Sequence, residues 1–213
     1  MGAEHPAPDT VVQCAEVADR VWSSRTKWMG NLIPLLCMLP FALTGTVLML
    51  HSHAVTVIGV ALCLLSLVVG WAAVNQFGLF GNVQLRKEIQ RKALARAGRD
   101  ASKGIFVGFA RPSYVGLLDA HEDLGFLFFD ADGVEYLGEI HQVKLSRKDV
   151  LGVRFRGNVH SALGLGRWVS IEAMHKGKRV RVLVEPREAR TLLGNRKRGT
   201  RLRKEIVDWM KGV

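Results

Sequence analysis

The stretch that decides the fold reads MGNLIPLLCMLPFALTGTVLML at residues 29–50, then HSH at 51–53, then AVTVIGVALCLLSLVVGWAAV at 54–74. No Asp, Glu, Lys or Arg occurs between Trp28 and Leu85. A helix rises about 1.5 Å per residue, so each apolar run is roughly 32 Å long, close to the ~30 Å hydrocarbon thickness of a bilayer. The pattern predicts a transmembrane helical hairpin over residues 28–80.

Basic residues flank the hairpin at both of its ends, whereas the turn between the two runs carries none. Arg20, Arg25 and Lys27 precede the first run, and six basic residues follow the second run between positions 86 and 99. Because cytoplasmic flanks carry the excess of Lys and Arg, we expect an integral protein of the bacterial cytoplasmic membrane with both termini cytoplasmic. The first run is too long for a signal peptide and lacks a cleavage site, so we expect it to be retained.

Inside the hairpin, small residues and prolines predict how the helices pack. Pro34 and Pro40 each remove a backbone donor from the first helix, and Ser66 and Gly70 form a small-xxx-small pair in the second. Neither run contains an ionisable residue of the kind that marks ion or proton paths, which disfavours a transport role.

Two soluble segments border the hairpin on its cytoplasmic side. Residues 1–27 form an N-terminal arm, for which a cap at Asp9 and an apolar face ending at Trp22 predict an amphipathic helix. Residues 81–100 predict a basic juxtamembrane helix. That helix either continues the second span, lies against anionic headgroups, or serves only as a topogenic signal.

Beyond residue 100 the apolar period changes from that of a helix to that of strands. Turn-bounded runs predict strands at 105–110, 125–129, 134–137, 142–145, 150–156, 168–173 and 179–184, followed by helices at 186–193 and 200–211. The last helix has an apolar stripe that can cover an open barrel. The expected fold class is therefore an α+β membrane protein, in which residues 101–213 form an antiparallel β-barrel or sandwich with a C-terminal helix.

Two segments, GFLFFDADGVEY at 125–136 and VKLSRKDVLGV at 143–153, resemble the bacterial PH-like and GRAM-like pattern of membrane-anchored proteins. The resemblance covers residues 104–212 and rests on the order of elements. It implies a PH-like binding or scaffolding module rather than an enzyme. The loop at 111–124 departs from lipid-binding PH domains because it has one basic residue and three acids, which disfavours a phosphoinositide site there.

Charge is segregated along the β-domain. Acidic residues dominate positions 119–139, and residues 176–204 hold twelve Lys or Arg against Glu185 and Glu188. The candidate contacts to anionic lipid or to an acidic partner are Arg86, Lys87, Arg91, Lys92, Arg179, Arg181, Arg196, Lys197, Arg198 and Arg201. The alternative is that both charged sets are simply solvated faces.

Motifs that carry chemistry are missing from the sequence. His121-Glu122-Asp123 lacks the second histidine of a zinc-protease helix, and Gly164-Leu165-Gly166 is neither a P-loop nor a dinucleotide fingerprint. His51 and His53 have no third ligand nearby, and the three cysteines show no metal or redox spacing. We expect no enzyme activity, no cofactor, no metal and no small-molecule substrate, and the basic run at 196–204 lacks the aromatics of a nucleic-acid site.

The sequence thus favours a membrane-anchored adaptor or scaffold that presents a cytoplasmic PH-like domain to a protein partner or to a second copy of itself. Two alternatives stay open at this point. One is an anionic-lipid sensor that uses the basic C-terminal face, and the other is an accessory subunit of a membrane transporter or enzyme complex.

Overall fold

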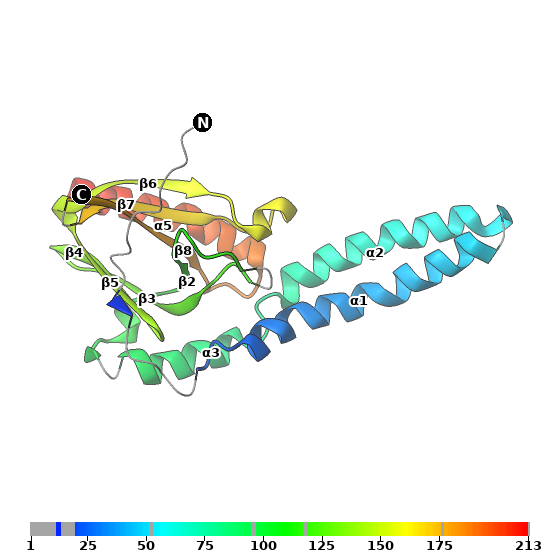
Figure 1. The fold of residues 1–213 in the computed structure, drawn as a ribbon, viewed down its shortest axis with the longest axis horizontal. Helices are drawn as coiled ribbons and strands as arrows, with labels where there is room; N and C mark the ends of the chain where they lie inside the picture. The colour runs from blue at the N-terminus through cyan, green and yellow to red at the C-terminus, as the bar shows by residue number, and fades with distance from the viewer. Residues whose placement is uncertain are drawn as a thin grey trace. The chain divides into compact units, whose positions relative to one another are not determined.

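The computed structural model describes residues 12–13, 20–51, 53–94, 97–116, 119–175 and 177–212 (Figure 1). The chain divides into two compact units. A helical unit comprises Ser24–Phe80, and a β-unit combines Met1–Ser23 with Gly81–Val213. The fold class is α+β, and each unit is treated below by itself.

The helical unit is a pair of long apolar helices, α1 (Ser24–His51) and α2 (Thr56–Phe77), with the 3₁₀ turn η1 (His53–Val55) between them. Both helices are long and apolar enough to cross a membrane. Their large apolar side chains are mostly exposed, as at Leu50, Val57 and Val68. Such exposure is unlike that of a core helix in a soluble protein, and it supports membrane association.

Small residues bring α1 and α2 together. A Cβ added to Gly45 would lie 2.7 Å from the carbonyl oxygen of Gly59, so the backbones meet at a distance that only glycine allows. The predicted packing residues Ser66 and Gly70 are buried, and a Cβ on Gly70 would come within 3.2 Å of the Met38 sulfur. Of the two prolines inside α1, Pro34 is buried and Pro40 is exposed.

The β-unit contains one antiparallel sheet in the order β1-β5-β4-β3-β2-β8-β7-β6. Its strands are β1 (Val12–Gln13), β2 (Ile105–Ala110), β3 (Asp123–Phe129), β4 (Gly133–Gly138), β5 (His141–Ser146), β6 (Val150–Arg156), β7 (Trp168–His175) and β8 (Lys178–Pro186). The remaining elements are α3 (Asn82–Ile89), η2 (Gln90–Leu94), η3 (Ala101–Lys103), η4 (Arg147–Asp149), η5 (Val159–Leu163) and α5 (Leu192–Lys211). All seven predicted strands are confirmed.

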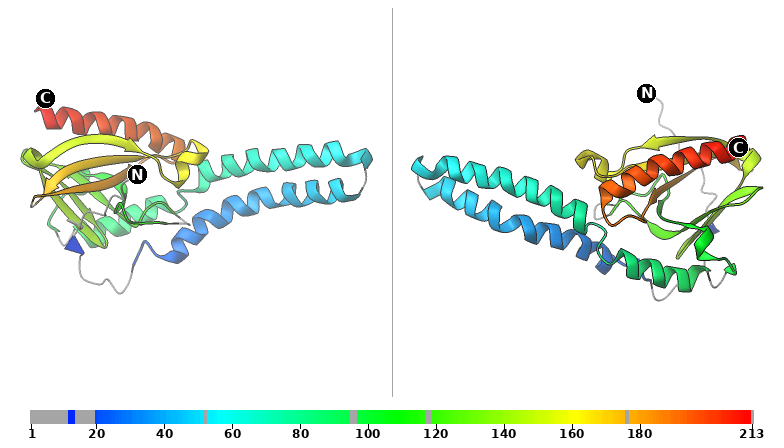
Figure 2. Two further views of the ribbon diagram at one scale, coloured as in Figure 1. Left: turned by 45° about the horizontal axis from the view of Figure 1, so that its top comes forward. Right: turned by 180° about the vertical axis from the view of Figure 1, so that it is seen from behind.

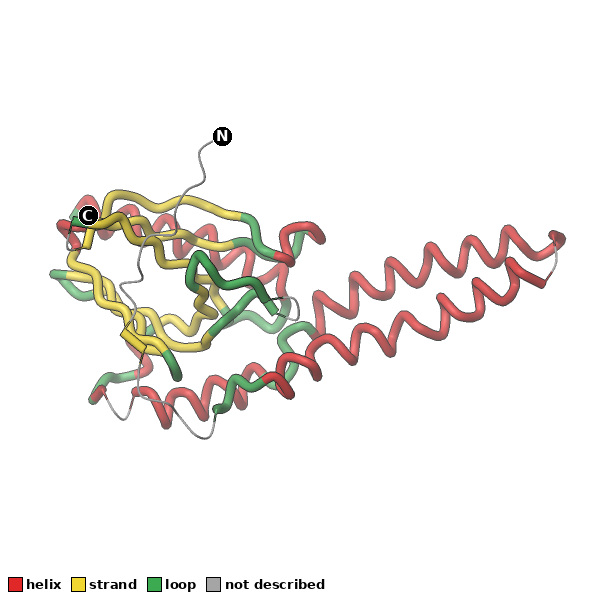
Figure 3. Tube along the Cα trace, in the orientation of Figure 1, coloured by secondary structure: helices red, strands yellow, loops and turns green. Residues whose placement is uncertain are grey.

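The strands form two meanders, β2 to β5 and β6 to β8, joined where β8 pairs with β2 (Figure 3). Inward-facing side chains of both meanders share one core that includes Leu127, Tyr136 and Ile171. Helix α5 lies along β6, β7 and β8 and closes this core with Leu202 and Ile206 (Figure 2). The apolar stripe of the last helix therefore covers the sheet as predicted.

A second apolar cluster lies on the opposite, outer face of β2, β3 and β4. Phe106, Phe126 and Leu137 point to this face and pack against Leu85 and Ile89 of α3. Strand β3 is consequently buried on both faces, which explains why residues 124–129 are almost continuously apolar instead of alternating. The helix expected over residues 81–100 is thus part of the β-unit, an arrangement that the sequence analysis did not consider.

Two predicted helices are wrong where the structure describes them. Val12–Gln13 pairs with β5, and residues 20–23 are not helical, so no helix runs through this part of the arm; the rest of the predicted arm helix lies outside the described residues. Residues 187–191 are also not helical. Helix α5 begins only at Leu192, because the Thr191 side chain accepts a hydrogen bond from the Gly194 amide as an N-cap.

Candidate functional site

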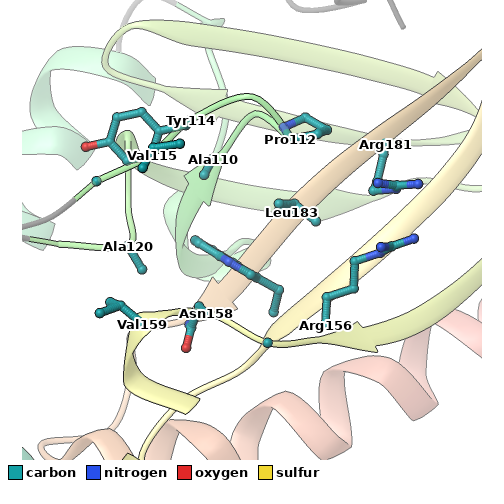
Figure 4. Close-up of a pocket in the computed structure, with 13 residues that line it drawn as sticks. Ala110, Pro112, Tyr114, Val115, Ala120, Arg156, Asn158, Val159, Arg181 and Leu183 are labelled. Carbon is teal, nitrogen blue, oxygen red and sulfur yellow. The ribbon is translucent and has the colours of Figure 1, made fainter. Parts of the chain in front are cut away.

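The loop between β2 and β3, rather than a helix, covers the end of the outer sheet face that carries Ala110, Trp168 and Leu183. Arg111 anchors the start of this loop through ion-paired hydrogen bonds to Glu122, with the Arg111 Nε 3.0 Å from Oε1. Between the loop and the sheet lies a cavity of about 480 Å³, within the range of ligand pockets (Figure 4). It is the strongest candidate site in the described part of the chain.

The pocket has an apolar side and a basic side. Trp168 and Leu183 form its floor on the sheet, and Tyr114 contributes an aromatic ring from the loop. Arg156 and Arg181 extend their side chains together at one end, opposite Tyr114 and Val115 (Figure 4). Asn158, at the start of the β6–β7 loop, supplies a further polar side chain to the lining.

The arginines of the pocket belong to a group gathered around one buried carboxylate. Glu172 on β7 lies 3.2 Å from Arg156, 3.3 Å from Arg179 and 3.9 Å from Arg181. Burial alone would raise the pKa of Glu172, but the hydrogen bond from Arg156 and the charges of the other arginines lower it. A single carboxylate therefore faces three guanidinium groups, and the surface carries excess positive charge.

A second cluster of charges is buried beside the pocket. His121 is 1% exposed, and its Nδ1 lies 2.5 Å from Oδ1 of Asp119 while its Nε2 lies 3.2 Å from Oε2 of Glu185. Arg187, 2% exposed, places a guanidinium nitrogen 3.3 Å from the His121 ring and 4.0 Å from Asp119. Two carboxylates, one imidazole and one guanidinium thus form a charge cluster that is neutral when His121 is protonated.

Neighbouring polar groups add further hydrogen bonds to the carboxylates of this cluster. Glu185 accepts hydrogen bonds from the Asn158 side chain at 2.8 Å and from the Arg167 amide at 2.9 Å. Asp119 also accepts one from the His121 amide. Because Asn158 lines the pocket as well, the charge cluster and the pocket share a wall.

Gly108 on β2 makes room for the histidine. A Cβ at this position would meet the His121 ring at 1.9 Å, so only glycine leaves space for the ring against the sheet. Trp168 packs its edge against the same ring, with centroids 5.1 Å apart.

The pKa values of the cluster follow from burial and from its opposed charges. Burial disfavours the charged form of His121, but Asp119 and Glu185 together raise its pKa above the ordinary value of 6.5. Burial likewise opposes ionisation of Asp119, yet His121 and Arg187 hold its pKa well below the usual range. Burial lowers the pKa of nearby His160, whose ring centre is 6.3 Å from that of His121.

Residues that border the helical unit in sequence also converge on this cluster. Arg187 stacks over the Trp22 ring at 4.8 Å and donates from Nε to the Asn82 side chain at 3.1 Å. Asn82 in turn donates to the Arg187 carbonyl. The buried Glu139 carboxylate accepts the backbone amides of Val21 and Trp22. One arginine thus joins the segment before α1 to the segment after α2.

The structure separates the basic residues that the sequence grouped together. Arg181 lines the pocket and Arg179 lies beside it, whereas Arg86 pairs with Glu188 and stacks on Phe126. Lys87 and Arg91 are exposed on the α3–η2 segment, and Lys92 there is half-buried. On α5, Arg196 donates to the Gly164 carbonyl, Arg198 pairs with Glu188, and Lys197 and Arg201 are exposed.

Sequence reasoning missed Arg156, Trp168 and the Asp119–His121–Glu185–Arg187 cluster. Nothing in the sequence showed that Arg156, from the strand predicted at 150–156, and the β2–β3 loop line the same pocket. Among the residues that the structure describes, no three His, Cys, Asp or Glu side chains are placed to hold a metal ion. Comparison with protein-family models, curated proteins and solved structures finds no match for this chain.

Proposed function

We propose that this protein is a membrane-anchored adaptor, in which the α1–α2 hairpin spans the membrane and a PH-like β-unit binds another protein on the cytoplasmic side. The observation that carries the proposal is the joining of Trp22 and Asn82 through Arg187. Both chain segments that lead into the hairpin are fixed to one site of the β-unit. A folded module joined to both ends of a hairpin is suited to stay at the membrane and present a binding surface to a partner.

The order of strands supports the PH-like part of the proposal. A four-stranded meander, a three-stranded meander and a closing C-terminal helix follow one another in the chain. This is the order of elements that the resemblance of residues 104–212 implies. Sheet edges and loops of such modules serve binding, with function set by the site rather than by the fold.

The chemistry of the pocket supports binding rather than catalysis. Its charged lining residues are Arg156 and Arg181, and guanidinium groups recognise anions. His121, the group best suited to proton transfer, is buried and held between two carboxylates. We therefore propose a binding module, and no enzyme.

A photo-crosslinking experiment in native membranes tests the adaptor. A photoreactive amino acid replaces Val159, Leu151 or Leu193, three exposed apolar positions of the β-unit, and the adducts are identified by mass spectrometry. We expect a defined partner protein at one of these positions and not at Leu50 in α1. Recovery of self-adducts alone would count against an adaptor, and adducts restricted to Leu50 would favour an accessory subunit that docks through the hairpin.

A second candidate, an anionic-lipid sensor, is favoured by one surface. Lys197, Arg201 and Lys204 are exposed on α5 at i, i+4 and i+7 spacing and form a basic face of this helix. A polarity-sensitive dye on K197C, in nanodiscs of phosphatidylglycerol or of phosphatidylcholine, reports whether this face meets lipid. A blue shift in the anionic discs that high salt reverses would support the sensor, and equal spectra in both discs would reject it.

A further inference from the structure

The rim of the pocket exposes apolar side chains on two opposite sides. Val115, from the β2–β3 loop, is 86% exposed, and Val159, from η5, is 51% exposed. Both line the cavity, whose floor is Trp168 and Leu183 (Figure 4). An apolar surface that runs from the floor over both rims suits an occupant that extends beyond the cavity itself.

The basic end of the pocket has more positive charge than its own carboxylate can neutralise. Arg156 and Arg181 share Glu172 with Arg179, and the exposed Arg154 lies on the same face of β6. The Nε of Arg181 is shielded from solvent and lies 3.9 Å from Oε1 of Glu172, and Arg156 reaches the same carboxylate through one terminal nitrogen. The other guanidinium nitrogens of these two arginines are the groups that can bind a ligand carboxylate.

We propose that this pocket binds an acidic peptide segment of the partner protein, with a carboxylate held by Arg156 and Arg181 and an adjacent apolar side chain resting on Trp168 and Leu183. The proposal rests on the adaptor function and names the chemistry of its partner. Planar guanidinium groups match the two oxygens of a carboxylate. A cavity of about 480 Å³ takes a few side chains rather than a folded domain.

The charge and the exposed rims favour a peptide over a small anion or a lipid. A free anion would use the arginines but leave the apolar floor and both rims uncovered. A peptide covers the rims with the residues on either side of its anchor, in the manner of segments that dock through one apolar and one charged side chain.

The test uses the full chain in nanodiscs of neutral phosphatidylcholine and a displayed library of random heptapeptides. We expect enrichment of peptides that combine Asp or Glu with a large apolar residue. The enriched peptides, synthesised and measured by fluorescence anisotropy, should bind R156Q/R181Q at least about tenfold more weakly, since two charge-assisted hydrogen bonds are lost. They should bind R190Q, which removes an exposed arginine outside the pocket lining, with unchanged affinity.

The variant E172Q is expected to bind acidic peptides more tightly. A misfolded protein would not show such a gain of affinity. E172Q removes the carboxylate that pairs with Arg156, Arg179 and Arg181 while keeping the shape of the side chain, so acidic peptides should bind about two- to tenfold more tightly. No enrichment, enrichment without acidic residues, or equal binding by the wild type and R156Q/R181Q would each overturn the proposal. Displacement of the peptides by phosphatidylglycerol at low concentration would assign the pocket to lipid instead.

The same variant separates failure of this inference from failure of the adaptor function. If R156Q/R181Q still forms the partner adduct at Val159 in native membranes, the adaptor stands and the pocket is not its peptide site. If no partner adduct forms with the wild-type protein, the adaptor itself fails, whatever the pocket binds.

Discussion

The two halves of the outer sheet face are covered in different ways. Over β2, β3 and β4 the cover is helix α3, and Ile89 and Phe126 meet in a dry apolar contact. Over the neighbouring end of β2, β8 and β7 the cover is the β2–β3 loop, whose His121 packs against Gly108, and a cavity lies between this loop and Trp168 and Leu183. An apolar cover needs only shape to seal a sheet, whereas a polar cover must also give each polar group a partner. The loop-covered part leaves a cavity, whereas the helix-covered part is filled by apolar side chains that include Ile89 and Phe126.

The largest effect on the unfolding free energy is expected from removing Arg187, which belongs to the buried charge cluster of the loop-covered part. R187M removes the buried cation and leaves Asp119 and Glu185 facing only His121, so we expect a loss of about 3–5 kcal/mol in unfolding free energy. The control is R190M, which removes an exposed arginine nearby and should change stability by no more than about 0.5 kcal/mol. Denaturant unfolding of the full chain in detergent, followed by near-UV circular dichroism, measures both. Equal stability of the two variants would show that Arg187 is not structural.

The apolar cover is broken by shortening Ile89, which is fully buried between α3 and the sheet. I89A should cost about 2–5 kcal/mol, through lost burial and the cavity left behind. V83A is the control, because Val83 lies on the exposed side of α3. It should leave the unfolding free energy within about 0.5 kcal/mol of the wild type. A small loss for I89A would mean that α3 is not part of the β-unit.

Local patterns predicted most of the fold. All seven long strands follow from apolar runs bounded by turn residues, whether the run alternates as in β6 or is almost continuously apolar as in β3, which is buried on both faces. The position of α3 against the sheet could not be predicted from the sequence, because Leu85 and Ile89 do not differ in pattern from the apolar residues of other basic helices. Helix α3 packs where it does because Phe106 and Phe126 point outward from β2 and β3. Both residues lie on strands that were expected to form the core of the β-domain.

The candidate site was less predictable because it is made by one loop. Arg181 was singled out from charge alone, but its neighbour Arg156 comes from another strand and Trp168 from a third. His121 was set aside for lack of a metal-ligand spacing, since its actual partners Glu185 and Arg187 lie more than sixty residues away. Long-range charge pairing of this kind leaves no periodic signal in a sequence.

A smaller effect is expected from filling the space that the sheet leaves for the histidine. The Cβ of G108A would overlap the His121 ring and push it from its place between Asp119 and Glu185, at a cost of about 1–3 kcal/mol. G152A is the matched change on β6, where nothing lies within 4 Å of the added Cβ, and it should be close to neutral. If both substitutions were neutral, the fit of His121 against β2 would not matter for stability.

The smallest change is the loss of one proton from the polar cover. Because the folded protein raises the pKa of His121, the stabilisation that this group provides is fully present below its ordinary value of 6.5 and is lost as pH rises through the folded value. Asp119, whose pKa is lowered, stabilises above its ordinary value of 3.8 and loses that contribution only as pH falls through the folded value. His160 acts in the opposite sense to His121, since its lowered pKa reduces stability as pH falls below 6.5.

Because His121 and His160 change the stability in opposite directions with pH, the pH dependence of the wild type alone cannot separate them. Variants must therefore be compared. The difference in unfolding free energy between wild type and H121Q should shrink as pH rises above 6.5, because only the wild type loses the His121 proton there. H160Q keeps the cluster intact and should still show the alkaline decline. A constant difference between wild type and H121Q would mean that His121 is neutral in the folded protein, and the cluster would then carry an uncompensated negative charge. I89A, in the apolar half, should lower stability by the same amount at every pH, because no group that titrates in this range lies in that contact.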